Sequence, residues 1–472
     1  MRVLLINPHI ENIIQSSAVK ELEKKNITGL YPPLGILYIA SYIKENSSHE
    51  VKVLDLHASE TPINSLRSNL KEYQPDVVGI STKTFTLIDS LTILQEVKHV
   101  NPDVITVMGG RHPTIYPEET AKQKHVDYII QGEGEATFLE LLNVLETQQE
   151  PKDVKGIAYY KENKSVNNGM SEYIQDLNLL PNPDRSLIDV SKYFSSIGGG
   201  LNTTMQSSRG CPYKCIYCDI LEGKKFRWRT PENMIVEIKE ILSLGIKEVF
   251  FVDDIFTIRK ERVLQFCDAL IKNNIDLKWK ISSRVDTVDE EMLAQLKKAG
   301  CYRIHFGLES GSDTILTGMK KNINTDQIRK AISLSKAAGI ESLGYFMIGS
   351  PGETQEDINQ TIDFACSLEL DFVSFSTTVP YPATELYREG VSNGIFQEDY
   401  WKKFAEKPDR NFVPKLYNEN FSDAELYSLT KKAYRKYYLR WGFIRNKLKT
   451  ITSLNQLFRY SVGALKVMNT SK

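Results

Sequence analysis

The sequence predicts an α/β protein built from two successive units of alternating strands and helices, followed by a helical end. Short apolar runs rich in β-branched residues alternate with helix-like stretches over residues 1–147. A second series of six such repeats covers residues 201–390. The length of 472 residues, with 41% hydrophobic and 25% charged residues, is typical of a folded chain of several domains.

The composition excludes several classes of protein. Lys and Arg number 59 and Asp and Glu 60, so the net charge of −1 gives no support for binding nucleic acid through overall charge. No window approaches the roughly 18 apolar residues of a membrane span, and the apolar run at the start is shorter than a signal-peptide core. Six cysteines are too few for a disulfide scaffold. We expect a cytoplasmic protein.

Residues 1–147 are expected to form a doubly wound parallel sheet of the Rossmann type. The expected strands are 3–7, 51–55, 76–81, 104–108 and 128–131, and the expected helices are 34–44, 63–73, 87–99 and 136–145. Ligands of such sheets bind beyond the carboxyl ends of the strands, which points to the loops 7–9, 81–83, 109–114 and 132–135. The glycines of these loops either let backbone approach a ligand closely or simply make tight turns.

Residues 148–200 are expected to be a linker. They contain a hairpin-like piece at 156–164, a proline-rich strap at 180–184 and a run of three glycines at 198–200.

Residues 201–390 are expected to curl into a partial (βα)6 barrel. The expected strands are 203–207, 249–253, 278–282, 303–308, 342–348 and 372–379. Right-handed crossovers place the working residues of such a unit at the carboxyl ends of the strands. Residues 391–472 are expected to be a helical, basic C-terminal segment.

Three cysteines after the first strand of the second unit carry the sharpest chemical signal. Cys211, Cys215 and Cys218 have the spacing C-x3-C-x2-C, with which one loop can bind three irons of a [4Fe–4S] cluster and leave the fourth iron open. Structural zinc is the alternative, but it takes four ligands and no further Cys or His follows within 45 residues. The other cysteines, Cys267, Cys301 and Cys366, are expected to be small apolar residues of the interior.

The cysteine loop closely resembles that of the radical S-adenosylmethionine (SAM) superfamily, over about residues 201–390. The resemblance implies a cluster held by the three cysteines and reductive cleavage of SAM to a 5′-deoxyadenosyl radical. It also implies the following SAM contacts: Tyr217 and Gly349 with adenine, Asp253 with the methionine amino group, Ser283 and Arg284 with the carboxylate or ribose, and Glu309 with a ribose hydroxyl. The family's usual Gly-Gly-Glu is absent beside Asp253.

The first unit resembles the cobalamin-binding module that precedes the barrel in a large subgroup of this superfamily. Segments 4–8, 31–35, 109–114 and 132–135 carry the resemblance. The implied cobalamin contacts are Ser81, Thr82, Gly109, Gly110, Gly132, Glu133 and, as a cobalt ligand, His9. The motif Asp-x-His-x-x-Gly is altered here, because Asn7 and Asn12 replace its first and last residues. We therefore expect cobalamin to bind with its base displaced and without a histidine ligand.

These resemblances predict a radical SAM enzyme that acts on a small-molecule or lipid-like substrate and takes electrons from a flavodoxin or ferredoxin type of donor. Methyl transfer from cobalamin to an unactivated carbon is the leading reaction. One alternative is cyclisation, carbon–carbon coupling or dehydration without methylation, as in relatives that resemble the anaerobic porphyrin-ester cyclase. Another is a cobalamin-binding sensor or carrier with a vestigial barrel.

The C-terminal residues 431–472 contain eleven Lys or Arg and no Asp or Glu, with aromatic residues between them. A stretch of this kind suits peripheral contact with an anionic membrane surface. It equally suits a helical lid packed on an acidic barrel. No nucleic-acid motif accompanies it.

Overall fold

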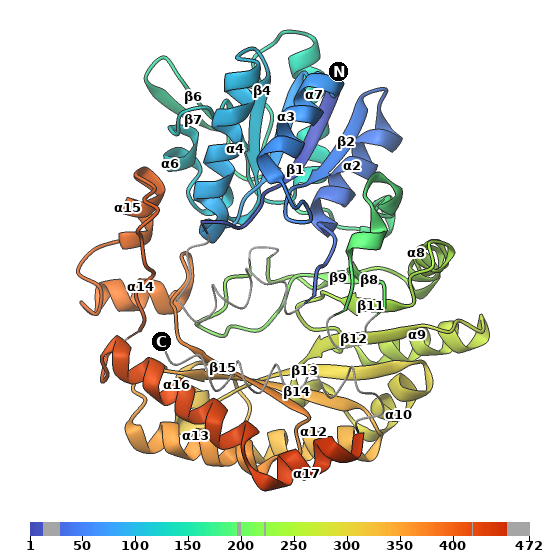
Figure 1. Cartoon of the computed structure of the whole chain (residues 1–472), viewed down its shortest axis with the longest axis vertical. Coiled ribbons are helices and arrows are strands. Elements are labelled where there is room, and N and C mark those ends of the chain that lie inside the picture. Colours follow the sequence, from blue (N-terminus) through green and yellow to red (C-terminus); the bar gives the residue numbers. More distant parts are fainter. Residues whose placement is uncertain (13–28, 196–199, 221–222, 418, 451–472) are drawn as a thin grey trace.

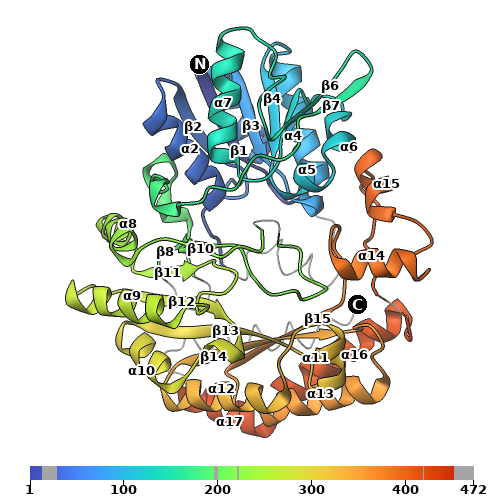
Figure 2. The same ribbon diagram turned by 180° about the vertical axis from the view of Figure 1, so that it is seen from behind.

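A computed structural model of the chain describes residues 1–12, 29–195, 200–220, 223–417 and 419–450. Figure 1 shows an N-terminal α/β domain above a second α/β unit, with the C-terminal helices beside and below that unit. Figure 2 shows the same arrangement from behind. The predicted fold class is confirmed.

The N-terminal domain is built on a seven-stranded sheet in the order β2-β1-β3-β4-β5-β6-β7. The strands are β1 (Arg2–Asn7), β2 (Glu50–Asp55), β3 (Val77–Ser81), β4 (Ile105–Gly109), β5 (Tyr128–Ile130), β6 (Ile157–Lys161) and β7 (Lys164–Asn167). The first five are parallel and agree with the predicted strands to within one or two residues. The hairpin β6–β7 is antiparallel, so the sheet extends beyond residue 147 into the segment predicted as a linker.

Helices cover both faces of this sheet, as in a doubly wound fold. On one face α2 (Leu34–Asn46) packs against α7 (Gly134–Glu146) over a core that includes Leu37 and Phe138. On the other face α3 (Pro62–Tyr73) packs against α4 (Leu87–Val100), and the short helices α5 (Arg111–Ile115) and α6 (Pro117–Ala121) join the same core. The carboxyl ends of β1 to β5 are directed toward the second unit (Figure 1).

The second unit is an open barrel of six parallel strands in the order β15-β14-β13-β12-β11-β8. The strands are β8 (Asn202–Met205), β11 (Glu248–Phe251), β12 (Lys278–Ser283), β13 (Cys301–Glu309), β14 (Glu341–Ile348) and β15 (Phe372–Thr377). Their outward side chains pack on α8 (Pro231–Ser243), α9 (Lys260–Lys272), α10 (Glu290–Lys298), α11 (Asp313–Gly318), α12 (Thr325–Ala337) and α13 (Gln355–Ser367). β8 and β15 are the edges of the sheet and do not pair with each other, as a partial barrel requires.

The C-terminal helices complete the barrel and reach the N-terminal domain. α14 (Glu385–Ser392) and α15 (Tyr400–Glu406) share a core with α3 and α4, and α15 packs on α6. α16 (Asp423–Tyr438) packs on β15 and α13 and buries Tyr437, and α17 (Trp441–Thr450) follows it. The described part of the basic segment therefore packs on the barrel, while residues 451–472 lie outside the described residues. Within the described part, no helix is long and apolar enough to cross a membrane.

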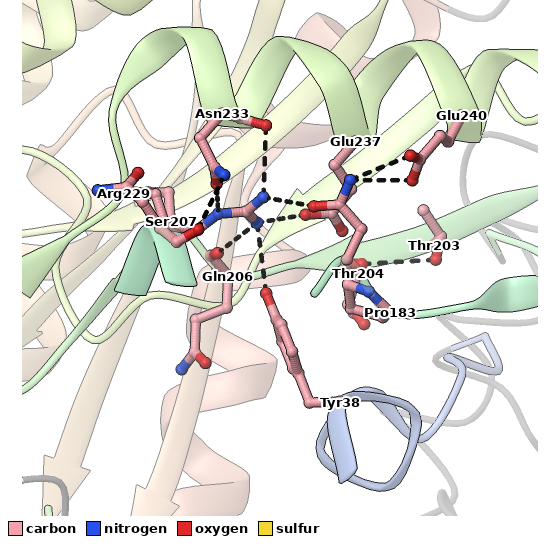
Figure 3. Close-up of polar contacts among 12 residues, drawn as sticks. Tyr38, Pro183, Thr203, Thr204, Gln206, Ser207, Arg229, Asn233, Glu237 and Glu240 are labelled. Atoms are coloured by element: carbon pink, nitrogen blue, oxygen red, sulfur yellow. Dashed lines mark hydrogen bonds and ion pairs between the residues drawn. The ribbon is translucent and has the colours of Figure 1, made fainter. Parts of the chain in front are cut away.

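A buried Arg–Glu–Arg cluster ties the two domains together at the start of the barrel. Glu237 on α8 accepts from Arg229, and its other oxygen accepts at 2.7 Å from Arg185, which directly follows the strap. Arg229 also donates to the Tyr38 hydroxyl of α2 at 3.3 Å (Figure 3). The side chains of both arginines and of Glu237 are at most 2% exposed. The strap therefore lies between the domains as a packed joint.

Candidate functional site

The three-cysteine loop leaves the barrel through a small two-stranded ribbon. β9 (Ser208–Arg209) pairs antiparallel with β10 (Arg227–Trp228), and these strands lie between the two domains. Gly210 follows with φ +84°, and a Cβ there would collide with the Lys225 carbonyl. Glycine is thus required for the turn that leads into Cys211.

Of the three cysteines of this loop, Cys211 is buried and Cys215 and Cys218 are partly buried. Burial raises the pKa of Cys211, and it raises the pKa of Cys218 to about 12, with nearby thiols and the carboxylates of Asp254 and Asp219 adding to these shifts. Thiolates here thus need a nearby positive charge, such as iron. In the part of the chain that the structure describes, no group of three or more His, Cys, Asp or Glu side chains, the three cysteines included, is arranged to hold a metal ion. The side-chain positions therefore favour neither a cluster nor zinc. Each thiolate of a cubane binds a different iron.

Asp253, predicted to bind the methionine amino group, lies buried behind the cysteine loop. Its carboxylate accepts from the Ser207 amide at 2.7 Å and the Ser208 hydroxyl at 2.6 Å, and from the Ser207 hydroxyl. Arg262 lies 3.5 Å from the same group. These bonds hold the end of β8 and the entry to the loop, and contact with SAM stays a prediction.

Ser283 and Arg284, predicted near the SAM carboxylate or ribose, lie at the end of β12. The Ser283 hydroxyl is 2.5 Å from that of Thr257. Arg284 donates to both carboxylate oxygens of Asp286 at 2.8 and 3.0 Å and lies 3.8 Å from the centre of the Tyr213 ring. It also approaches the Cys215 sulfur at 3.9 Å. Arg284 therefore places positive charge directly beside the cysteine loop.

Glu309 and Tyr217, both predicted SAM contacts, meet at a third residue that the sequence did not single out. Glu309 Oε1 accepts from Lys321 Nζ at 2.8 Å and from the Tyr217 hydroxyl at 3.0 Å, and Lys321 Nζ is 3.1 Å from that hydroxyl. Glu309 adopts φ +64° at a register shift between β13 and β14. A non-glycine residue in this region is strained, which is common at functional sites. The sequence alone does not distinguish Lys321, which is buried, from its neighbour Lys320, which is exposed.

Gly349 directly follows β14 and is the first residue of the loop predicted to contact adenine. Its φ is +87°. Its amide donates to Glu353 Oε2 at 2.7 Å, and the Ser350 amide donates to the same oxygen at 3.0 Å. Burial raises the pKa of Glu353 to about 7, although these two amides act in the opposite direction. Glu353 thus fixes the backbone of this loop through two hydrogen bonds. The contact of Gly349 with adenine stays a prediction.

A cavity of about 470 Å³ lies at the carboxyl edge of the N-terminal sheet. Five of the seven predicted cobalamin contacts line it: Ser81, Gly109, Gly110, Gly132 and Glu133. Gln206, Arg209 and Val252 of the second unit line it as well. The cavity therefore opens at the junction of the two domains, beside the entry to the cysteine loop.

The two other predicted cobalamin contacts do not line this cavity. Thr82 donates its hydroxyl hydrogen to Ser90 at 2.9 Å inside the domain. His9 is buried with Nε2 3.6 Å from an Asp89 oxygen. The expectation that cobalamin binds without a histidine ligand stays a prediction.

The cavity suits part of a cobalamin molecule. Its volume lies in the range of sites for drug-sized ligands, which is enough for a part of cobalamin such as its nucleotide tail. A Cβ added at Gly109 would make only ordinary van der Waals contact with Ile130, at 3.8 Å, so this position of the cavity wall has room for a side chain. The lining is mainly apolar, with charged groups such as Lys83, Arg111 and Glu133 at the mouth.

The lumen of the barrel carries a chain of aromatic rings below Glu309. His305 of β13 lies between Phe250 of β11 and Tyr345 of β14, with ring centres 5.2 and 5.9 Å apart, and Tyr31 adjoins Phe250. The His305 Nδ1 atom is 3.2 Å from the Tyr345 hydroxyl. Burial lowers the pKa of His305 to about 3, with help from Arg303 and Lys280. The imidazole is therefore neutral near pH 7.

Comparison with family models identifies both units. The model of the radical SAM superfamily matches residues 205–365, and the model of the B12 binding domain matches residues 24–142. These two matches cover the cysteine loop and most of the cavity's lining residues.

Whole-chain comparisons agree with these matches. An uncharacterized methyltransferase of Pyrococcus horikoshii is 34% identical over 93% of both chains. The anaerobic magnesium-protoporphyrin IX monomethyl ester cyclase of Rubrivivax gelatinosus is 28% identical over 99% of this chain and 82% of its own. The solved structure of OxsB, a cobalamin-dependent SAM radical enzyme with aqua-cobalamin and SAM bound, has the same fold, with a TM-score of 0.76 and 19% identity. That match covers 99% of this chain and 71% of the other.

Proposed function

Because the chain belongs to the radical SAM superfamily and carries a B12 binding domain ahead of its barrel, we propose that it methylates an unactivated carbon of a small-molecule substrate. Membership in this family confirms the predicted cofactors, a [4Fe–4S] cluster, SAM and cobalamin. When bound, the cluster and SAM supply a 5′-deoxyadenosyl radical, and cobalamin supplies a carrier for the methyl group. The further alternative of a sensor with a vestigial barrel finds no support, because the three cysteines and the polar barrel site are intact.

One observation carries the proposal: the cavity of the B12 binding domain is walled on one side by the barrel. Gln206 and Arg209 line it only a few residues before Cys211, and Val252 lines it beside Asp253. A ligand in the cavity would thus lie at the entry of the cysteine loop. Residues around the cavity would bind and orient the methyl carrier, and the three thiols would hold the cluster.

The substrate is expected in the barrel lumen. Tyr345 is 42% exposed there, and its partner His305 is neutral. An aromatic wall with one neutral imidazole suits a largely uncharged substrate that presents a flat or apolar face. Glu309 ends β13, the strand that carries His305, and Lys321 of the loop after α11 is paired with it. These two residues would orient SAM.

The first test concerns the cluster. Replacing Cys215 by Ala should abolish both the iron content of anaerobically purified protein and the production of 5′-deoxyadenosine, because one iron loses its ligand. Cys366→Ala is the matched control, since Cys366 is a free thiol on α13, on the outer side of the barrel. Full SAM cleavage by the Cys215 variant would contradict the radical reaction.

A second candidate keeps the radical and omits methyl transfer. The similarity to the porphyrin-ester cyclase over nearly the whole chain favours it. Mass analysis of products formed with methyl-labelled SAM separates the two functions. Label in the product supports methylation, whereas 5′-deoxyadenosine with an unlabelled, rearranged or dehydrated product supports the alternative. Peripheral membrane contact through residues 431–472 and a flavodoxin- or ferredoxin-type electron donor stay predictions.

A further inference from the structure

Ion pairs join both ends of the cysteine loop to the loops that line the cavity. Arg209 directly precedes Gly210 and Cys211, and Asp219 directly follows Cys218. Each belongs to an ion pair with the N-terminal domain. The loop for the cluster is therefore attached to the B12 binding domain on either side of its three thiols.

The first attachment is buried. Arg209 lies 2.6 Å from Glu135 Oε1 and 3.2 Å from Glu133 Oε1, and the three side chains are 5–8% exposed. Arg227, the partner of Arg209 across the β9–β10 ribbon, lies 2.9 Å from the same Glu133 oxygen. Burial alone would lower the pKa of Arg209, but Glu135 and Glu133 raise it above its ordinary value. Removing either carboxylate would leave the two buried arginines with a single carboxylate between them.

The second attachment lies nearer the surface. Arg111 Nη1 is 2.7 Å from Asp219 Oδ2, and each side chain is 34% exposed. Arg111 follows Gly109 and Gly110 and lines the cavity, whereas Asp219 is not among the lining residues. Asp219 can therefore be changed without removing a group from the cavity wall and without leaving a buried charge.

We propose that these ion pairs couple the two cofactor sites, so that a formed cluster tightens cobalamin binding and bound cobalamin favours cluster assembly. Ligation by three thiols fixes residues 211–218 and thereby the positions of Arg209 and Asp219. These residues then hold Glu133, Glu135 and Arg111 in place at the cavity, so cobalamin has less loop motion to restrict when it binds. Arg209 and Asp219 act as positioning residues. The inference rests on the proposed function, since it presupposes a cobalamin site in this cavity.

The coupling is measured as a ratio of dissociation constants. Hydroxocobalamin is titrated by anaerobic equilibrium dialysis against full-length protein with its cluster assembled and against the same protein after the iron has been chelated. Coupling free energies between sites commonly correspond to about 5- to 150-fold changes in affinity. We expect the cluster to tighten cobalamin binding at least fivefold in the wild type. Because linkage is reciprocal, hydroxocobalamin should slow loss of iron to a chelator.

Asp219→Asn is the decisive variant. It should reduce the affinity ratio toward one by weakening cobalamin binding only in the cluster-loaded protein. Asp363→Asn is the matched control, because Asp363 forms an exposed ion pair with Lys436 on the far side of the barrel. Exchanging the charges in R111D/D219R should restore part of the ratio. Arg209→Lys, which keeps the buried charge but loses the two-pronged geometry, should lower the ratio as well.

The outcomes separate this inference from the proposed function. No cobalamin binding by the wild type in either state would contradict the cobalamin-dependent function itself. Equal affinity with and without the cluster would overturn the coupling alone. A ratio preserved in both Asp219→Asn and Arg209→Lys would show that the ion pairs do not carry it.

Discussion

At the residue scale, the site depends on side-chain contacts that could not be predicted from the sequence. The cysteine spacing and Glu309 were predictable because each lies in a short local pattern. The contact of Glu309 with Lys321 and with Tyr217, 92 positions earlier, depends on the tertiary fold. The same holds for Asp253, which the resemblance assigns to SAM and which the structure shows bonded to Ser207 and Ser208. Local patterns therefore name the candidate residues, and the fold decides what each one contacts.

Glu309→Gln should weaken SAM binding by about tenfold or more. A hydrogen bond to a charged group contributes about 1.5–3 kcal/mol, and the substitution also leaves Lys321 without its counter-charge. Tyr217→Phe keeps the Glu309–Lys321 pair and should cost only a few-fold through the lost phenol hydrogen bond. SAM affinity is measured anaerobically by calorimetry on cluster-loaded protein. Unchanged affinity in the Glu309 variant would argue against its predicted role at the ribose.

Glu353 should make stability depend on pH. Its folded pKa of about 7 is above the ordinary value of 4.5, so its contribution to stability is complete below about pH 4.5 and is lost as pH rises through 7. Above pH 7 the ionised, buried carboxylate costs about 3 kcal/mol. Glu353→Gln, whose oxygen can still accept from Gly349 and Ser350, should gain stability over the wild type between pH 5 and pH 8. Urea unfolding at both pH values measures this, with the exposed Glu356→Gln as control.

At the element scale, the regular strands and helices were predictable, and the assembly of distant pieces was not. The first five strands of the N-terminal sheet and the six strands of the barrel coincide with short apolar runs in the sequence. Such runs are typical of parallel strands that are buried on both faces. From the sequence, the hairpin β6–β7 is expected to be an isolated hairpin in a linker, because pairing with a distant strand leaves no local pattern. In the structure β6 pairs antiparallel with β5, and the hairpin extends the sheet. Likewise, nothing in the sequence of α16 shows that it packs on β15.

The loop after β4 gives a test of the cavity. Gly109→Leu should reduce hydroxocobalamin affinity at least tenfold, because a bulky side chain at a residue that lines the cavity would reduce the space for the ligand. Gly110 is a poorer probe, since its φ of +101° and a contact of 2.8 Å with the Thr82 carbonyl would strain any side chain. Gly442→Leu on α17 is the matched control, because a Cβ added there has no atom within 4 Å and Gly442 does not line the cavity. Equilibrium dialysis gives the affinities, and circular dichroism verifies the fold.

If Gly109→Leu binds hydroxocobalamin as tightly as the wild type, the cavity is not the cobalamin site. Loss of affinity in Gly442→Leu as well would indicate a general effect on folding.

At the scale of the whole molecule, two domains and a strap form one assembly. Arg229 and Glu237 of the barrel meet Tyr38 of the N-terminal domain in one buried network (Figure 3). Arg185, which directly follows the strap, joins this network through Glu237. α14 and α15 add a second junction on the opposite side, where they share a core with α3 and α4. The distance between the cavity and the cysteine loop is thus held at two separate places.

Glu237→Leu should destabilise the folded protein by about 3–5 kcal/mol, because it leaves two buried arginines without a counter-charge. Thermal unfolding followed by circular dichroism measures the loss. Glu232→Leu, on an exposed face of the same helix and outside this network, should change stability by no more than about 1 kcal/mol. Equal effects of the two substitutions would show that the buried network does not hold the domains together.

The packing of α16 on β15 bears on how the chain folds during synthesis. β15 ends at Thr377, but the helix that covers it begins only at Asp423, after α14 and α15 have crossed to the N-terminal domain. Domains generally fold as units from the N-terminus during translation. The N-terminal domain can therefore form early, whereas the barrel edge with Val373 and Phe375 stays uncovered until the end of the chain emerges. A nascent chain stalled near residue 390 should consequently be the form most prone to self-association and most dependent on chaperones.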